Sequence, residues 1–181
     1  ASKARRNGLR RRAILKRLIL SHLGMSDERK VAARKCAVHA VTYDVAAQLL
    51  NTYHLQGSAP ASMYLGLVSE GVVVAVALFA RGAVDGPNRI GWRLVRYATS
   101  CRVVGGLSKL MAAARRERIG DEPIWTHSSN ATFTGQVYER TGFTKVHESK
   151  PTYTYWFMGR WWHRSDFRLD RMAHRFAERG M

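Results

Sequence analysis

The sequence predicts a mixed α/β fold built around one core, with a basic helix at each end. The chain has 181 residues, which is the size of one ordinary domain, and 46% of them are hydrophobic. Short apolar runs alternate with helical patterns from Cys36 onward. We therefore expect a basic helical extension over residues 1–35, a domain over 36–158 and a basic C-terminal helix over 159–181, packed on or beside the domain.

The first segment predicts a basic amphipathic helix that Gly24 ends. Its apolar residues recur at three- and four-residue spacing, as a helix with one buried face requires. Such a helix either docks on the body with a solvated charged rim or contacts phosphate directly. The candidate nucleic-acid contacts here are Arg10, Arg11, Arg12, Lys16 and Arg17.

The middle of the chain predicts a strand, a helix and a hairpin. Ala37–Val41 has strand character, and Thr42 is a suitable N-cap for a helix that runs through Leu50. The apolar runs 63–68 and 72–80 are joined by Ser69-Glu70-Gly71, a turn composition. These two runs predict an antiparallel hairpin.

The following segment predicts an exposed loop at 81–90 and a strand at 92–98. Simple alternation places Trp92, Leu94 and Arg96 on one face of that strand, opposite Arg93, Val95 and Tyr97. The remaining expected elements are a helix at 105–118, a strand at 124–128, a helix at 134–141, strands at 143–148 and 152–157, and a basic amphipathic helix at 164–178.

Charge is the strongest compositional signal. The chain carries 30 Lys and Arg against 13 Asp and Glu, a formal net charge of +17. Such a field attracts polyanions, so we expect DNA as the partner, with RNA as the alternative. An anionic membrane surface and a ribosomal-type protein are the less favoured interpretations. Cys36 and Cys101 form no CxxC pair, and no apolar run is long enough to cross a membrane, which together favour a reducing, cytoplasmic location.

A glycine turn at the centre of the chain predicts an anion site. Gly105-Gly106 follows an expected strand and opens a helix, where free amides and the helix dipole favour phosphate. The spacing matches neither GxGxxG nor GxxxxGK[ST], and a tight turn without a ligand is the alternative. The candidate cofactor-binding residues are Arg102, Val103, Val104, Gly105, Gly106, Ser108 and Lys109.

The C-terminal region mixes aromatic and basic residues. Rings stack on bases and Arg contacts phosphate, so Trp161, Trp162 and Arg164 are further candidate nucleic-acid contacts. In the alternative interpretation Tyr153, Tyr155 and Phe157 form the buried face of a strand and the tryptophans anchor the last helix. We expect these three residues in the core and Trp162 or His163 at the surface.

Several segments together resemble a known family. The turn at 102–109 and the Tyr138-x-x-x-Gly142-Phe143 segment are similar to the acyl-CoA-binding half of GNAT acyltransferases. The order and spacing of the segments 51–57, 94–97, 103–110, 135–143 and Pro151-x-Tyr-x-Tyr resemble the GNAT-like domain of the phage Mom DNA-modification family, which is also found with very-short-patch-repair-type endonucleases.

This resemblance implies a GNAT-like fold, a mixed and mostly antiparallel sheet flanked by helices. It implies a phage-type enzyme in the host cytoplasm that adds an acyl-derived group to a DNA base amine and so evades restriction. Acetyl-CoA or another acyl-CoA-like molecule is the implied donor. The implied catalytic residues are His54 as a base, Arg96 as an anion contact and Tyr138 as a proton donor.

The chain departs from the family pattern where the relatives carry an acidic residue, because Ser128, Ser129 and Asn130 stand there. Ser129 or Asn130 is the candidate to contact a base edge in its place, and Ser129 is the candidate catalytic residue. The departure keeps a second function open, a non-catalytic DNA- or RNA-binding module. An acetyltransferase for a protein or small-molecule amine is disfavoured by the charge. Structural roles also stay open, in which His54 caps a helix, Arg96 forms an ion pair and Tyr138 packs; no metal site is predicted.

Overall fold

A computed structural model describes residues 3–83, 90–129, 133–148, 153–157, 160–168 and 172. The chain divides into two compact units, Ala1–Phe143 and Thr144–Met181, and each is described by itself. The sequence analysis placed boundaries after residues 35 and 158. Those domain boundaries stay a prediction; the N-terminal helix falls within the same compact unit as the sheet.

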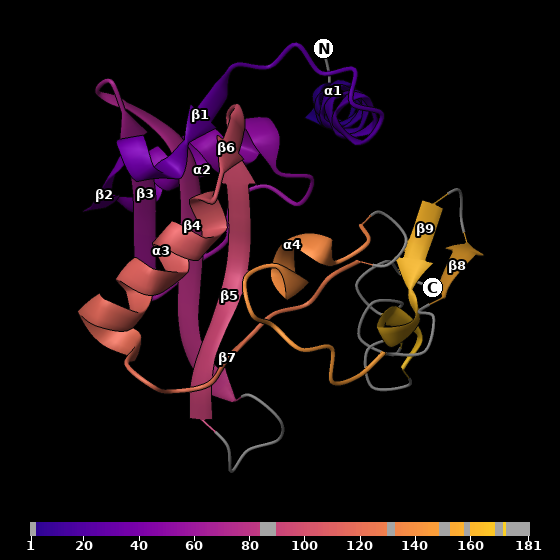
Figure 1. Ribbon diagram of the computed structural model, residues 1–181. Helices are drawn as coiled ribbons and strands as arrows, with labels where there is room; N and C mark the ends of the chain where they lie inside the picture. Colours follow the sequence, from indigo (N-terminus) through magenta and orange to yellow (C-terminus); the bar gives the residue numbers. More distant parts are fainter. Residues whose placement is uncertain are drawn as a thin grey trace. The chain divides into compact units, whose positions relative to one another are not determined.

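The first unit contains most of the regular structure (Figure 1). Its α-helices are α1 (Lys3–His22), α2 (Tyr43–Tyr53), α3 (Gly106–Ala114) and α4 (Gln136–Glu139). Its strands are β1 (Lys30–Ala32), β2 (Ala37–Ala40), β3 (Met63–Ser69), β4 (Val72–Ala83), β5 (Ile90–Thr99), β6 (Arg102–Val104) and β7 (Ile124–Trp125). A 3-10 turn at Ala33–Lys35 follows β1, and a π-helical turn at Arg115–Ile119 continues α3.

The main sheet has the order β2-β3-β4-β5-β7. Its first four strands are antiparallel, and β5 pairs with β7 in parallel. The predicted mixed, mostly antiparallel sheet flanked by helices is therefore confirmed. A separate parallel pair of β1 and β6 was not predicted, because its strands lie far apart in the sequence and have only three residues each.

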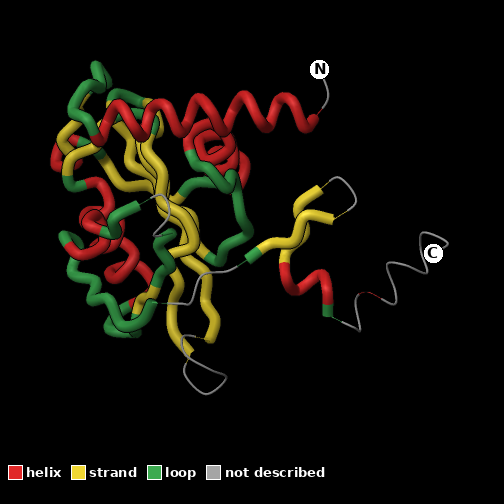
Figure 2. The backbone as a smooth tube through the Cα atoms, turned by 90° about the vertical axis from the view of Figure 1, so that its right-hand side faces the viewer, coloured by secondary structure: helices red, strands yellow, loops and turns green. Residues whose placement is uncertain are grey.

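Helices cover both faces of the sheet. Leu107, Leu110 and Met111 of α3 pack with apolar residues of β3, β4 and β5 in the larger core. Leu49 and Leu50 of α2 pack on the opposite face, in a smaller core. Figure 1 shows α3 lying across one face of the sheet, and Figure 2 shows α1 passing over α2. Alternation along the strands produces these two apolar faces.

Two predictions from local sequence patterns, the N-cap of a helix and an antiparallel hairpin, are confirmed. The Thr42 side chain accepts a hydrogen bond from the Val45 N–H at 3.4 Å and so caps α2. The predicted hairpin is formed by β3 and β4, with Glu70 at φ 51° and Gly71 at φ 77°. Two successive residues with positive φ form the turn that suits the twist of a hairpin.

Two expected elements, the loop at 81–90 and the strand at 143–148, are wrong in extent or kind. Arg81 and Gly82 belong to β4, opposite Trp92 and Gly91 of β5, because the antiparallel pair is longer than its apolar run. Residues 84–89 of the expected loop lie outside the described residues. The expected strand at 143–148 is irregular, and no strand pairs with it in the part of the chain that the structure describes.

The second unit contains a hairpin of β8 (Thr154–Phe157) and β9 (Arg160–His163), followed by a 3-10 turn at Arg164–Phe167. Most of the expected helix at 164–178 lies outside the described residues. Tyr153 and Tyr155 are 54% and 43% exposed, so their predicted burial in a strand face is wrong. The Phe157 side chain lies outside the description. A two-stranded hairpin has too few neighbours to bury both of its faces.

Candidate active site

The candidate site begins where β5 and β7 separate. Their parallel pairing joins only Trp92 to Ile124 and Arg93 to Trp125. Directly after it, the Thr126 hydroxyl donates to the Leu94 carbonyl at 2.9 Å. This side-chain bond ends the pairing. Within the described residues, β5 has no strand partner on its β7 side beyond Arg93.

A β-bulge changes the direction of the β5 side chains at the same point. Phe79 of β4 lies opposite Leu94, and Leu78 lies opposite Arg96, which leaves Val95 as the extra residue. Trp92, Leu94 and Tyr97 consequently pack on the α3 side, whereas Val95 packs on the α2 side. The predicted alternation, which put Tyr97 opposite Trp92 and Leu94, is wrong because the inserted residue reverses the pattern.

Besides Nε1 of Trp92, three buried polar atoms of β5 and of residues 124–128 lie without a hydrogen-bond partner. They are Nε of Arg96, Nε1 of Trp125 and Oγ of Ser128. Buried polar groups are nearly always satisfied, so a group of unsatisfied ones needs an explanation. Arg96 uses one terminal nitrogen on its neighbour, the Val95 carbonyl, at 2.7 Å, and this bond leaves Nε–H available. Two of the three atoms are N–H donors, which a ligand oxygen would satisfy.

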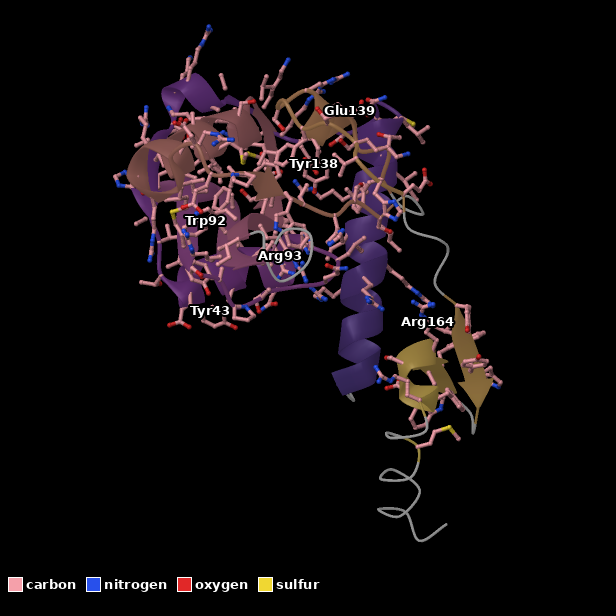
Figure 3. The ribbon with its side chains drawn as sticks, turned by 90° about the horizontal axis from the view of Figure 1, so that it is seen from below. Tyr43, Trp92, Arg93, Tyr138, Glu139 and Arg164 are labelled. Carbon is pink, nitrogen blue, oxygen red and sulfur yellow. The ribbon has the colours of Figure 1, made fainter. Side chains whose placement is uncertain are left out.

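Tyr138 lies beside Thr126, at the point where β5 and β7 separate. It comes from α4, its ring meets that of Phe143 edge-on at 5.8 Å, and both rings pack against the larger core. Its hydroxyl is hydrogen-bonded to the Thr126 side chain. Burial raises the pKa of Tyr138, while Thr126 and the charge of Arg96 oppose that rise. The phenol is therefore protonated at neutral pH. Figure 3 labels Tyr138 and its neighbour Glu139, which is exposed.

His54 lies at the end of α2, where its backbone N–H donates to the Leu50 carbonyl at 2.8 Å. Burial, then Arg96, then Arg10 lower the pKa of His54 to about 4. The ring is therefore neutral at pH 7. Its Nδ1 accepts from the Gln56 N–H at 3.2 Å, which assigns the proton to Nε2. A ring in this state donates a hydrogen bond and is a weak base.

The structure thus brings three of the four predicted catalytic residues together. The charge of Arg96 acts on both His54 and Tyr138, so all three lie within electrostatic range of one another. The fourth, Ser129, is exposed, and its carbonyl accepts from the Phe133 N–H at 2.9 Å. Ser128 is the serine whose hydroxyl is buried and unsatisfied. Asn130 lies outside the described residues.

The glycine turn opens a helix as predicted, but the strand directly before it is β6 and not the expected strand at 92–98. Gly105 follows β6 with φ 75° and is the N-cap of α3, with no side-chain cap. That conformation favours glycine. Arg102, Val104 and Ser108 are exposed, and Val103 is half-buried. Arg102 and Ser108 thus offer a charge and a hydroxyl at the N-terminus of α3.

Two other residues of the turn serve the fold. A Cβ on Gly106 would lie 2.5 Å from Oη of Tyr97 and 3.0 Å from Cγ1 of Val103. The Leu107 N–H donates to that Tyr97 hydroxyl, so one amide of the first turn of α3 is already used. Nζ of Lys109 donates to the Ala33 carbonyl at 3.0 Å and also to that of Cys36. Gly106 and Lys109 therefore have structural roles that their prediction as phosphate ligands did not include.

The five basic candidates of α1 divide into two groups. Arg10 donates to the Asn51, His54 and Leu55 carbonyls at 2.8, 3.1 and 3.3 Å and so closes the end of α2. Arg17 binds Glu28, donates to the Thr99 carbonyl at 2.8 Å and lies 4.8 Å from the Tyr53 ring centre. The other three are exposed: Arg11, Arg12 and Lys16. Only these three are available to a polyanion.

The expected apolar face of α1 is not buried as a whole. Ile14 is buried beside Arg10 and Arg17, whereas Leu9, Ile19 and Leu23 are each more than half exposed. The basic residues therefore provide most of the attachment of this helix.

The two candidate tryptophans of the second unit differ in solvent exposure. Trp161 is 68% exposed, whereas Trp162 is half-buried and lies 6.2 Å from Phe167. The exposed Arg164 lies 5.9 Å from the centre of the Tyr153 ring.

Sequence reasoning did not find Thr126, Trp125 or Tyr97 as parts of the site region, and it named Ser128 only beside the candidate Ser129. Thr126 and Ser128 stand directly after a short apolar run, at the end of a strand, which is a signal for site residues in open sheets. Tyr97 has no such signal, because its partner Gly106 is met only through tertiary contact.

Metal and membrane sites receive no support. Within the described residues no group of three or more His, Cys, Asp and Glu side chains is arranged to hold a metal ion. The described helices include none with the length and apolarity needed to cross a membrane.

No protein-family model matches the chain, and no curated protein matches it. Among solved structures it is similar to an aminoglycoside acetyltransferase from an uncultured soil metagenomic sample, determined with trehalose. That match has a TM-score of 0.49 and 12% identity and covers 66% of this chain and 95% of the other. The same enzyme with sisomicin matches with a TM-score of 0.47 and 11% identity, over 68% of this chain and 97% of the other. An integron cassette protein from the mobile metagenome of V. cholerae matches with a TM-score of 0.47 and 12% identity, over 77% of this chain and 98% of the other.

Proposed function

We propose that this chain is an acyl-CoA-dependent acyltransferase that modifies an amine of a nucleic-acid base, of the phage DNA-modification type. The observation that carries the proposal is the point where β5 and β7 separate, because Arg96, Trp125 and Ser128 hold unsatisfied buried polar atoms there and Thr126 contacts a protonated Tyr138. Polar groups prepared in this way suit a ligand that supplies oxygen acceptors.

The residues present fit an acyl-CoA donor in part. Arg102, Ser108 and the Gly105 turn offer a charge, a hydroxyl and the start of a helix to its phosphates, while Gly106 and Lys109 serve the fold. The unpaired side of β5 and the Nε–H of Arg96 offer donors to the rest of the molecule. When bound, such a donor supplies an acyl thioester, from which transfer to an amine forms a C–N bond, breaks the C–S bond and moves one proton from nitrogen to sulfur.

Tyr138 fits the role of the proton donor in that transfer. Its phenol is kept protonated by burial, yet its hydroxyl remains hydrogen-bonded to Thr126 and close to the positive charge of Arg96. A cation near a phenol stabilises the phenolate that forms when the proton leaves. A positioned acid of this kind contributes about 10²- to 10⁴-fold to the rate.

The charges around the site favour a neutral acceptor amine. His54 is held neutral by burial and by Arg96 and Arg10, and burial followed by the charge of Arg93 lowers the pKa of Arg96 in turn. An alkylamine is an ammonium ion at neutral pH and would be repelled by these guanidinium groups. It would also need a strong base, which His54 is not. The exocyclic amine of a nucleobase is neutral, and it belongs to a polyanion that a chain of charge +17 attracts.

A second function is favoured by a specific observation. Lys109, Gly106 and the Leu107 amide are engaged within the fold, and serines replace the acidic residue that the resembled family carries. A non-catalytic nucleic-acid-binding module would retain the fold and the charge without any donor site. Binding of a donor therefore separates the two functions.

The test is mass spectrometry of nucleosides from the DNA of cells that express the protein. We expect a nucleoside with an added acyl-derived mass, lost in Tyr138→Phe and kept in Tyr43→Phe. Tyr43 is a matched control because its exposed hydroxyl lies on α2 beside Ser58, at 3.4 Å. Unmodified nucleosides together with tight DNA binding and no stabilisation by CoA would favour the binding module. Acylation of a polyamine in preference to DNA would refute the proposed acceptor.

A further inference from the structure

The hairpin of the second unit presents two aromatic pairs on opposite faces. In its register Tyr155 lies opposite Trp162, and Trp156 lies opposite Trp161. Successive residues of a strand point to opposite faces, so each cross-strand pair belongs to a different face of the ribbon. The two faces can therefore be compared directly.

The Tyr155–Trp162 face is covered within its own unit. Phe167 belongs to the 3-10 turn after β9. The centre of its ring lies 4.7 Å from the centre of the Tyr155 ring and 6.2 Å from that of the Trp162 ring. Tyr153 meets Tyr155 edge-on at 5.4 Å. These rings form a small aromatic cluster that holds the hairpin to the turn. Trp162, predicted as a nucleic-acid contact, takes part in this cluster.

The Trp156–Trp161 face is open. The two indole rings lie 5.1 Å apart at 63° and are 60% and 68% exposed. An edge-to-face pair of this kind holds each ring in a fixed orientation while leaving ring surface accessible. Two large exposed aromatic side chains on one face mark an interaction surface.

The charge of the unit indicates what that surface contacts. Residues 144–181 contain eight Lys and Arg against four Asp and Glu. The exposed Arg164 follows β9 directly and lies 5.9 Å from the Tyr153 ring. Exposed flat rings within a positive segment match the requirements of single-stranded nucleic acid, in which bases stack on aromatic side chains and phosphates meet cations.

We propose that the Trp156–Trp161 face is a stacking surface for unpaired nucleobases of single-stranded nucleic acid. This inference rests on and deepens the proposed function, since a base amine must be taken out of its pair before an enzyme can modify it. Trp156, which the sequence analysis did not include, replaces Trp162 as the partner of Trp161 in this role.

The test is fluorescence anisotropy with the full chain, using a short labelled oligothymidine and a duplex of the same length. Stacking of one base on an aromatic ring is worth about 1–3 kcal/mol. The double variant Trp156→Ala/Trp161→Ala is therefore expected to bind oligothymidine at least about tenfold more weakly, with a smaller loss for the duplex. The slope of log affinity against log salt should stay unchanged, because no charge is removed.

Three variants make the result specific. Trp156→Phe/Trp161→Phe keeps a ring pair and should retain most of the affinity if the rings stack on bases. Val146→Ser removes a side chain that is 93% exposed, without removing a ring, and should leave the affinity unchanged. Arg164→Ala should lower the magnitude of the salt slope by about 0.7 if it contacts a phosphate of a single strand.

Several outcomes would overturn the inference. They are an unchanged affinity of the alanine double variant for oligothymidine, an equal loss for oligothymidine and duplex, or an effect confined to self-association or to binding of anionic lipid vesicles. A labelled oligouridine distinguishes RNA from DNA as the source of the bases. The binding assay does not depend on acyl transfer, so it can succeed where the proposed reaction fails.

Discussion

Replacing Gly106 by Ala tests how the glycine turn is built. The added Cβ would lie 2.5 Å from the Tyr97 hydroxyl and 3.0 and 3.3 Å from side-chain atoms of Val103. Tyr97 is held in place by the Leu107 N–H, and the burial of its phenol raises its pKa above the usual range. The hydroxyl therefore cannot move away without losing its hydrogen bond.

The expected magnitude follows from these contacts. Overpacking of this kind costs about 1–3 kcal/mol, and the better helix propensity of Ala recovers less than about 1 kcal/mol at the first residue of a helix. We expect Gly106→Ala to lower the free energy of unfolding by about 1–2 kcal/mol. Tyr97→Phe alone should cost about 1 kcal/mol through the lost hydrogen bond.

The double-mutant cycle provides the assay, with urea unfolding followed by circular dichroism. In the Tyr97→Phe background the nearest atom to the new Cβ is gone, so Gly106→Ala should cost about 1 kcal/mol less there. Gly82→Ala, at a position with nothing within 4 Å of the added Cβ, is the matched control. An equal cost of Gly106→Ala in both backgrounds would refute the contact with Tyr97 as its cause.

Three further predictions concern other contacts. Arg17→Met, which removes the Glu28 pair, the bond to the Thr99 carbonyl and the stacking on Tyr53, should lower the free energy of unfolding by about 2 kcal/mol. The exposed control Lys16→Met should change it by less than about 0.5 kcal/mol, and equal effects would contradict the structural role of Arg17. Because the pKa of His54 falls to about 4 in the folded chain, the unfolded chain binds the extra proton between that value and about 6.5. The stability that His54 contributes is therefore complete above pH 6.5 and decreases by at most about 3 kcal/mol as the pH falls to 4, and urea titrations of His54→Gln should lack this part of the pH dependence. Glu70→Asn should raise the free energy of unfolding by about 0.5–1 kcal/mol, since Asn accepts the φ of 51° more readily and the lost Arg29 pair is exposed. A destabilised Glu70→Asn protein would show that the ion pair outweighs the turn.

Much of the fold could be predicted from local patterns. The hairpin of β3 and β4 follows from two apolar runs and a turn, and α2 follows from Thr42 and a helical apolar spacing. Each of these features depends on residues close in the sequence, so period and turn chemistry are sufficient. The motif resemblance likewise selected His54, Arg96 and Tyr138, which the structure brings together.

The tertiary structure decided what those residues can do. One inserted residue at Val95 reverses the faces of β5, and no local pattern announces it. The sequence predicts contact with nucleic acid for Arg10 and with phosphate for Lys109. In the folded chain both instead donate hydrogen bonds to backbone carbonyls that are far away in the sequence. His54 has an ordinary sequence context, and only burial beside Arg96 and Arg10 makes it neutral. The sequence by itself determined the net charge and those elements that local patterns specify, such as α2 and the β3–β4 hairpin. Pairing, burial and the protonation of the site depend on distances between segments, which only the folded chain defines.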